Sequence, residues 1–175
     1  MPDAYPQHPV PEAVQIEQYL CQVEQHCREA GVRLTPLRRE VLALILQANK
    51  PVGAYELLAN IGTAGRPAAP PTVYRSLDFL IEHGFIHRLA SINAYLSCCH
   101  PAHRHQSVFL ICTECQHTQE LPVGSLAAPL RELTVQQGFV VKQTLIELSG
   151  LCQRCQGLAP VHEPSSSHDP SCSHV

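Results

Sequence analysis

The sequence lacks the features of membrane-spanning or exported chains and those of common enzyme classes. No apolar run in its 175 residues approaches the length of a membrane span, and the N-terminus has no basic segment followed by an apolar one. There is also no Gly-rich phosphate loop or nucleophile motif. Trp is absent and aromatic residues make up 5 %, but the 45 % hydrophobic content is sufficient for a core. We therefore expect a soluble cytoplasmic protein that is not an enzyme and has no membrane partner.

Cysteine and histidine are abundant instead. The chain contains nine Cys and eleven His against a single Met. In a reducing compartment disulfides are rare, and an odd number of cysteines cannot all be paired. This composition favours metal ligation.

Two Cys-x-x-Cys knuckles give the strongest local signal. They read Cys112-Thr-Glu-Cys115 and Cys152-Gln-Arg-Cys155, separated by 36 residues. Each spacing permits a tight turn that brings two thiolates to roughly 2.3 Å from one Zn²⁺, and the pair completes a tetrahedron. Two disulfides or four buried thiols are the alternatives. A closed four-sulfur site leaves no open position for substrate, so we interpret it as structural zinc.

Other cysteines fall into two groups. Cys21 and Cys27 lie in a predicted helix, where we expect them to pack as small hydrophobic residues. Residues 98–105 read Cys-Cys-His-Pro-Ala-His-Arg-His, a second cluster of potential ligands. Adjacent residues of an extended chain point to opposite faces, so only one of Cys98 and Cys99 should bind a given metal.

The first half of the chain predicts helices followed by a hairpin. Apolar periodicity and breakers place helices at about 14–29, 36–50, 54–61 and 71–83, with Thr35 as N-cap and Pro36 at the first helical position of the second. Two short strands follow, at 85–89 and 94–96. Helices followed by such a hairpin predict a winged helix-turn-helix.

The fourth predicted helix has a polar N-terminal half. Val73, Leu77 and Leu80 form its core face, which leaves Thr72, Tyr74, Arg75, Ser76 and Asp78 outside that stripe. This half is the part that a recognition helix offers to DNA. Between residues 28 and 75 there are seven Lys/Arg against three acidic residues, although the net charge of the whole chain is −3. An ordinary amphipathic surface helix remains the alternative.

The second half predicts a smaller α/β unit. Strands are expected at 107–111 and 118–121, a helix at 126–137, and a strand at 139–148 that delivers the second knuckle. The predicted fold class is therefore α+β, with a winged-helix domain followed by a small α/β domain. We expect an N-terminal arm and DNA-binding domain over 1–87, a hinge over 88–96, a zinc-binding dimerisation domain over 97–160, and a disordered tail over 161–175.

Four motifs together resemble the ferric uptake regulator (Fur) superfamily. They are Arg33-Leu-Thr-Pro-Leu-Arg38, Pro71-Thr-Val-Tyr-Arg-Ser-Leu-Asp-Phe-Leu80, Gly84-Phe-Ile-His87 and the paired knuckles. The resemblance covers roughly residues 14–157, and within the superfamily the zinc uptake regulator branch is most similar. It implies a metal-dependent dimeric transcriptional repressor with a winged-helix domain, a dimerisation domain and a palindromic double-stranded DNA target.

The resemblance also implies functional residues. Tyr55, Thr72, Tyr74 and Arg75 match positions that face DNA. A second, regulatory zinc site between the domains matches His87, Cys98, His105 and Glu120, which gives two Zn²⁺ per chain. His100 and His103 are either surface residues or part of a third site.

The regulatory ligand set is chemically consistent with zinc. Two neutral imidazoles, one thiolate and one carboxylate around Zn²⁺ sum to zero charge, so the site can be partly buried. Sulfur favours zinc, whereas iron and manganese sensors prefer nitrogen and oxygen ligands. An iron, manganese or peroxide sensor of the same family remains an alternative. So does a zinc enzyme with Glu120 as general base, although four protein ligands already fill a tetrahedron.

Overall fold

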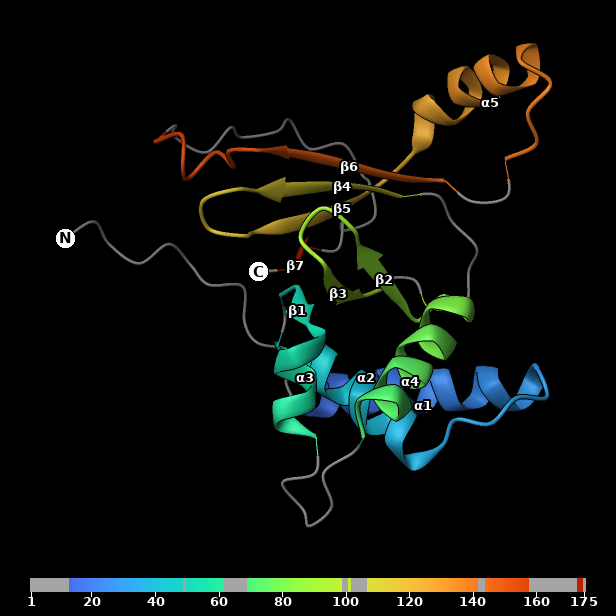
Figure 1. The fold of residues 1–175 in the computed structure, drawn as a ribbon, viewed down its shortest axis with the longest axis vertical. Coiled ribbons are helices and arrows are strands. Elements are labelled where there is room, and N and C mark those ends of the chain that lie inside the picture. The colour runs from blue at the N-terminus through green and yellow to red at the C-terminus, as the bar shows by residue number, and fades with distance from the viewer. Residues whose placement is uncertain are drawn as a thin grey trace. The chain divides into compact units, whose positions relative to one another are not determined.

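A computed structural model describes residues 13–48, 50–61, 69–98, 101, 107–141, 144–157 and 173–174. These residues form two compact units, which are drawn together in Figure 1. The N-terminal unit comprises the described residues up to 101, and the C-terminal unit those from 107 to 174. Among the described helices, none is long and apolar enough to cross a membrane.

The N-terminal unit consists of four helices and a three-stranded antiparallel sheet. The helices are α1 (Ala13–Glu29), α2 (Pro36–Ala48), α3 (Ala54–Asn60) and α4 (Pro70–Glu82). The strands are β1 (Val52–Gly53), β2 (Ile86–Leu89) and β3 (Ala94–Ser97), in the order β1-β3-β2. This arrangement confirms the predicted winged helix-turn-helix.

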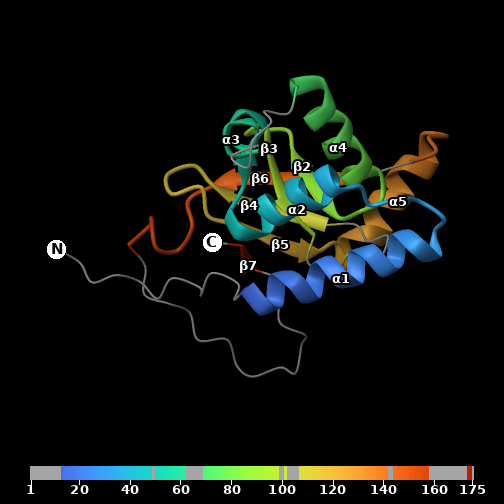
Figure 2. The same ribbon diagram turned by 90° about the horizontal axis from the view of Figure 1, so that it is seen from below.

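Helix α2 is the centre of this unit. It contacts α1, α3 and α4, and Figure 2 shows it between α1 and α4. The predicted apolar stripes are buried on each of these helices. On α1 they comprise Ile16, Leu20, Val23 and Cys27. On α2 they comprise Val41, Leu42, Ile45 and Leu46. Cys21, also expected to pack, is exposed, because it lies four residues from Glu17 on the solvent side of the same helix.

Two details of the N-terminal unit differ from expectation. Residues 88–96, predicted as a hinge, belong to the wing: β2 and β3 pair from Ile86↔Ser97 to Leu89↔Ala94. The hydrogen-bonded ladder fixes this segment within the unit, which continues beyond it to residue 101. Strand β1 was not predicted, since two residues are too short for a periodic signal; Val52 pairs with Tyr95.

The C-terminal unit is a four-stranded sheet with one helix. It contains β4 (Ser107–Cys112), β5 (Thr118–Pro122), the 3₁₀ helix η1 (Gly124–Leu126), α5 (Ala127–Gln136), β6 (Leu145–Gly150) and β7 (Ser173–His174). The order is β6-β4-β5-β7. Strand β6 pairs with β4 in parallel, whereas β5 is antiparallel to β4.

Two predictions for this unit require correction. Phe139 to Val141 lie outside any strand, and the strand predicted over 139–148 begins only at Leu145, where pairing with Ser107 starts. β-Branched residues near a strand raise local propensity, but the partner strand decides where pairing begins. The tail over 161–175 lies mostly outside the described residues; at Ser173 and His174 the structure has a strand paired with β5.

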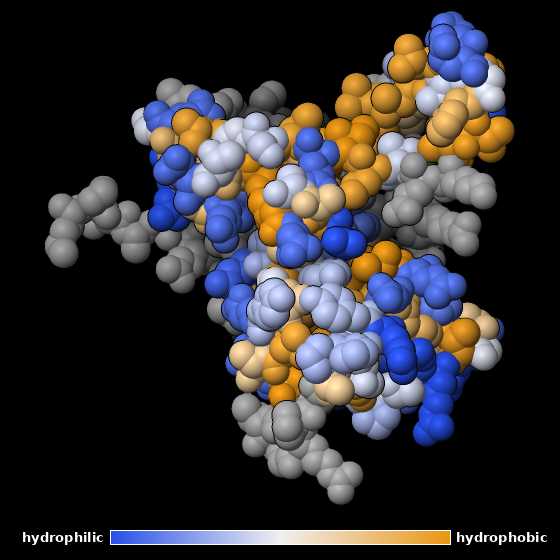
Figure 3. Space-filling view, viewed as in Figure 1, coloured by the Kyte–Doolittle hydropathy of each residue, from blue (hydrophilic) through white to orange (hydrophobic). Residues whose placement is uncertain are grey.

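The C-terminal unit leaves much apolar surface uncovered. Helix α5 has no buried residue and stands off the sheet in Figure 1. Figure 3 shows apolar side chains gathered along this helix. Leu133 and Val135 on the helix, Phe139 just after it and Leu148 on the edge strand β6 are each more than half exposed (62, 64, 65 and 53 %). Helix α5 and the edge strand β6 therefore leave apolar side chains exposed, whereas those of β4 are mostly buried.

Gly84 ends α4 in a left-handed conformation, with φ of 70°. Its N–H donates to the Ile81 carbonyl at 3.0 Å, and the N–H of Phe85 donates to the Leu80 carbonyl at 2.9 Å. This turn aims the chain from α4 into β2. A Cβ at position 84 would meet nothing within 4 Å, so any cost of a side chain arises from φ alone.

We expect Gly84→Ala to lower the free energy of unfolding by about 1–2 kcal/mol, because alanine disfavours positive φ. Gly84→Asn should lose less, since asparagine tolerates this region. Denaturant unfolding followed by the helical circular dichroism signal measures both. Equal stability of the alanine variant and the parent would show that the turn adopts another conformation.

Candidate metal centres and nucleic-acid interface

The four knuckle cysteines follow the ends of two neighbouring strands of the C-terminal sheet. Cys112 is the last residue of β4, and Cys115 lies on the turn after it. Cys152 and Cys155 lie on the loop that follows β6. Because β4 and β6 are parallel and paired up to Cys112↔Gly150, both knuckles emerge at the same end of the sheet. The topology thus joins two motifs distant in sequence.

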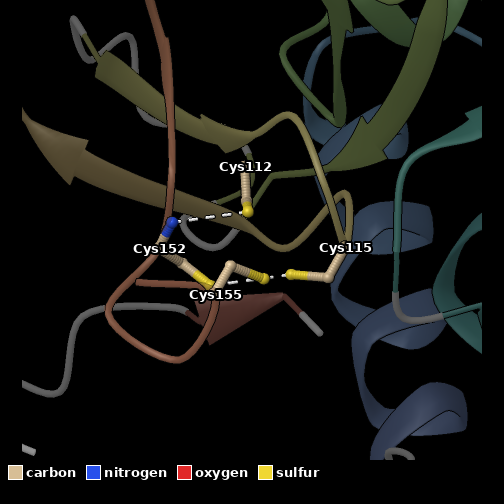
Figure 4. A group of neighbouring side chains, drawn as sticks. All are labelled: Cys112, Cys115, Cys152 and Cys155. Atoms are coloured by element: carbon tan, nitrogen blue, oxygen red, sulfur yellow. Dashed lines mark hydrogen bonds between the residues drawn. The ribbon is translucent and has the colours of Figure 1, made fainter. Parts of the chain in front are cut away.

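The sulfurs of this cluster converge, as Figure 4 shows. All four Sγ atoms lie within 4.8 Å of one another, and those of Cys115 and Cys152 are 3.6 Å apart. In a zinc tetrahedron with bonds of about 2.3 Å, neighbouring sulfurs are ~3.8 Å apart. The donor set and its spacing therefore fit Zn²⁺, and none of these cysteines forms a disulfide.

Backbone groups hold the cluster and adjust its charge. The N–H of Cys152 donates to Cys112 Sγ at 3.3 Å, which joins one knuckle to the other. Burial raises the pKa of Cys112, but backbone N–H groups of Cys115, Cys152 and Glu114 outweigh it and lower that pKa to about 6. Hydrogen bonds with the sulfurs of Cys115 and Cys152 raise the pKa of Cys155 to about 12. A metal that binds all four as thiolates must therefore displace protons.

A second ligand pair lies on the wing of the N-terminal unit. His87 is on β2, and Cys98 follows β3 directly. His87 pairs with Leu96, so it shares a face with Leu96 and, two residues later, with Cys98. A ring nitrogen of His87 lies within 4.8 Å of Cys98 Sγ. Zinc ligation needs ~3.6 Å between such atoms, so a small side-chain movement suffices.

Of the other two predicted regulatory ligands, the structure describes Glu120 but not His105. Glu120 lies on β5 of the C-terminal unit, where it is buried and accepts a hydrogen bond from the Ser107 hydroxyl at 2.5 Å. Phe109 pairs with Glu120 across the two strands, and Ser107 lies two residues before Phe109 on the same face of β4. His105, like Cys99, His100 and His103, lies outside the described residues.

The predicted DNA contacts are all exposed side chains of the N-terminal unit. Tyr55 on α3 is 82 % exposed, and Tyr74 on α4 is 40 % exposed. Thr72 and Arg75 are exposed on the first half of α4. Ser76, expected outside the core stripe, is buried instead. Its hydroxyl donates to the Thr72 carbonyl at 3.0 Å, so burial does not cost it a hydrogen bond.

Sequence reasoning missed Ser107 as the partner of Glu120 and the backbone bond from Cys152 to Cys112. No spacing rule indicates the first, since the two residues meet only through the β4–β5 register. The second has a weak signal, because backbone N–H groups within a knuckle turn commonly point at the sulfurs. Both become visible once the sheet is assembled.

Comparison with known proteins gives consistent matches. The model of the ferric uptake regulator family matches residues 29–149. The zinc uptake regulation protein of Escherichia coli (strain K12) is 36 % identical over 157 residues, which cover 89 % of this chain and 92 % of that protein. The zinc uptake regulation protein of Mycobacterium tuberculosis (strain ATCC 25618 / H37Rv) is 28 % identical over 130 residues, covering 73 % and 97 %.

Solved structures give a similar result. A crystal structure described as holo XcZur has a TM-score of 0.74 and 43 % identity, covering 80 % of this chain and 98 % of that one. A zinc uptake regulator complexed with zinc and DNA has a TM-score of 0.77 and 37 % identity, covering 81 % and 95 %.

We expect Cys112→Ser to remove one metal ion per chain and to destabilise the C-terminal unit, because the sulfur joins both knuckles. The loss should reach several kcal/mol, since binding at such a site contributes directly to folding. Metal content by plasma emission, together with thermal unfolding, measures this. Cys21→Ser, an exposed cysteine of the other unit, is the control. A normal melting curve for Cys112→Ser would show the cluster to be dispensable.

Proposed function

Because the chain belongs to the ferric uptake regulator family, we propose that it is a zinc-responsive, DNA-binding repressor of zinc-uptake genes. Three lines support this function: its relatives are zinc uptake regulators, one similar structure was solved with zinc and DNA, and the chain carries the winged helix that such binding needs. The observation that carries the zinc assignment is the convergence of His87 and Cys98 on one face of the wing.

The proposed metal sites have separate roles. Cys112, Cys115, Cys152 and Cys155 hold a structural zinc that closes the end of the C-terminal sheet. His87, Cys98, His105 and Glu120 form the regulatory site, which gives two Zn²⁺ per chain. The position of Cys98 supports its assignment over Cys99, because Cys98 shares a face with His87 and its N–H extends the wing ladder to the Phe85 carbonyl at 3.0 Å.

The regulatory mechanism follows from where these ligands sit in the chain. His87 and Cys98 belong to the N-terminal unit, and Glu120 to the C-terminal unit. When bound, zinc would supply a link between the two units through these side chains. In a dimer, the relative placement of the units sets the separation of two α4 helices. DNA requires about 34 Å, one helical turn, or a multiple of it.

The coupling free energy between zinc binding and DNA binding can be given a typical magnitude. A protein whose binding-competent arrangement is thinly populated binds its target more weakly by that population fraction. Allosteric coupling of about 1–3 kcal/mol corresponds to roughly a 5- to 150-fold change in DNA affinity. By reciprocity, operator DNA should tighten zinc binding by the same factor.

The homodimer is proposed to form through the C-terminal unit. Helix α5 buries no residue, and the edge strand β6 carries exposed Leu145 and Leu148. Exposed apolar area of this kind marks a surface that another chain covers. A two-fold dimer matches a palindromic operator, whose half-sites repeat the same contacts. Tyr55, Thr72, Tyr74 and Arg75 are the proposed DNA contacts.

Zinc is favoured over iron or manganese by the thiol of Cys98. Sulfur ligands select zinc, whereas iron and manganese prefer nitrogen and oxygen. We propose a cytoplasmic location, because cysteines that bind zinc as thiolates are maintained in a reducing compartment. A zinc enzyme is disfavoured because the proposed ligand sets leave no open position for substrate.

The test is a gel-shift titration on a palindromic duplex from the promoter of a zinc-uptake gene, with zinc-loaded and chelator-treated protein. We expect at least a 5-fold tighter Kd with zinc. Cys98→Ser should lose one zinc per chain, stay dimeric and lose this zinc response. Equal affinity with and without zinc would contradict the proposed function, and intact zinc content in Cys98→Ser would reassign the ligand to Cys99.

Arg75→Ala should weaken operator binding by about 1–3 kcal/mol, because an exposed guanidinium on the first half of α4 is placed to contact DNA. Arg131→Ala, which removes an exposed arginine from the other unit, is the control for lost charge, and size-exclusion chromatography checks that it stays dimeric because it lies on α5. Both variants should retain parental zinc content. An unchanged Kd for Arg75→Ala would remove this residue from the interface.

A further inference from the structure

Tyr19 connects α1 to the segment that carries Cys98. Its hydroxyl lies 2.7 Å from the Cys98 carbonyl and 3.1 Å from the Phe85 carbonyl. These contacts span 79 and 66 residues of sequence. The hydroxyl has one proton, so the shorter bond, to Cys98, takes the larger share of it.

The contact falls where the chain leaves the wing. The β2–β3 ladder ends at the pair Ile86↔Ser97, and the N–H of Cys98 then donates to the Phe85 carbonyl at 3.0 Å. The N–H of Cys98 is thus bonded to the sheet and its carbonyl to α1. With both backbone groups held, the direction of the Cys98 Cα–Cβ bond is set, and with it the face of the wing on which the thiol lies.

The helix that provides the hydroxyl is itself firmly anchored. On either side of Tyr19, α1 buries Ile16, Leu20 and Val23 in the core of the N-terminal unit. The ring of Tyr19 also packs against that core. Removing only the hydroxyl therefore leaves the helix and the ring in place.

We propose that Tyr19 is a positioning residue for zinc: by holding the Cys98 carbonyl, it keeps the thiol on the face of the wing where His87 lies. This proposal rests on the proposed function, since it takes Cys98 as a regulatory ligand. Groups behind a metal ligand orient it, and their loss commonly weakens metal binding without removing the ligand.

A purely structural role makes a different prediction. If Tyr19 only ties α1 to the wing, its hydroxyl should change the stability of metal-free protein and leave intrinsic zinc affinity unaltered. A positioning role should change zinc affinity even where the metal-free unit is fully folded.

The experiment uses full-length dimer that retains its structural zinc. Zinc is titrated against a competing chelator to obtain the Kd of the regulatory site, and urea unfolding measures the stability of the N-terminal unit. Tyr19→Phe should raise that Kd about 10-fold, with no loss of structural zinc.

Tyr95→Phe is the matched control. Tyr95 is buried, whereas Tyr19 is partly buried; Tyr95 lies on β3 three residues before Cys98 and pairs with Arg88. It loses a hydroxyl from the same hairpin without touching the Cys98 backbone contacts. Its regulatory zinc Kd should match that of the parent.

Three outcomes would overturn the proposal: an unchanged Kd in Tyr19→Phe, an equal rise in both tyrosine variants, or a Tyr19→Phe chain that fails to fold. The last would assign the hydroxyl to the stability of the unit. Cys98→Ser, titrated alongside, separates these failures from one in the proposed function. If that variant keeps parental regulatory zinc affinity, the ligand assignment itself is wrong.

Discussion

The parallel pairing of β4 and β6 is the constraint on which the C-terminal unit depends. It places the two knuckles at one end of the sheet, where four sulfurs meet. Few other interactions close this end: α5 buries nothing, and described bonds across it run from Thr113 to the Gly150 carbonyl and from Cys152 to Cys112 Sγ. A small sheet without a helix packed on it has little hydrophobic stabilisation of its own. In the proposed function, a tetrahedral ion at this end and a second chain over the apolar surface supply the missing stabilisation.

The N-terminal unit is organised differently. Its helices bury a continuous aliphatic core around α2, and its wing extends that core through Phe85, Ile86 and Tyr95. It therefore holds Thr72, Tyr74 and Arg75 on a helix whose opposite face is fixed. The proposed ligand pair His87 and Cys98 sits on the wing of this unit, which shares its core with α4. In the proposed mechanism, zinc therefore acts on the placement of the whole unit and leaves its internal structure unchanged.

Much of this could be predicted from sequence. Helical periodicity gave α1, α2 and α4 to within one or two residues, because their stripes are strong and their ends carry Pro36, Pro70 or Gly84. The family and the winged-helix fold were also predicted and are confirmed by the comparisons. The knuckle spacing predicted that four sulfurs would converge, and they do; the metal there stays a prediction.

The structural features that could not be predicted from the sequence depend on pairing between residues that are distant in the chain. The two-residue strand β1, the late start of β6 and the Ser107–Glu120 bond all follow from strand register. The segment 88–96, predicted as a hinge, is instead held in the wing by the pairing of β2 with β3. Tyr19 was missed for a related reason: on α1 it reads as an ordinary amphipathic position, and only the assembled unit brings its hydroxyl to residue 98.

The β4–β6 pairing also orders events during synthesis. All described elements of the N-terminal unit lie before residue 102, so this unit can fold while the rest of the chain is still being made. Strand β4 can pair with β5 early, but its parallel partner begins 38 residues after Ser107, at Leu145, and the cluster is incomplete until Cys155 has been added. A nascent chain therefore carries a complete winged-helix unit while the thiols of Cys112 and Cys115 still lack the other two cysteines of their cluster. The proposed structural zinc can complete its tetrahedron only after most of the chain has been made.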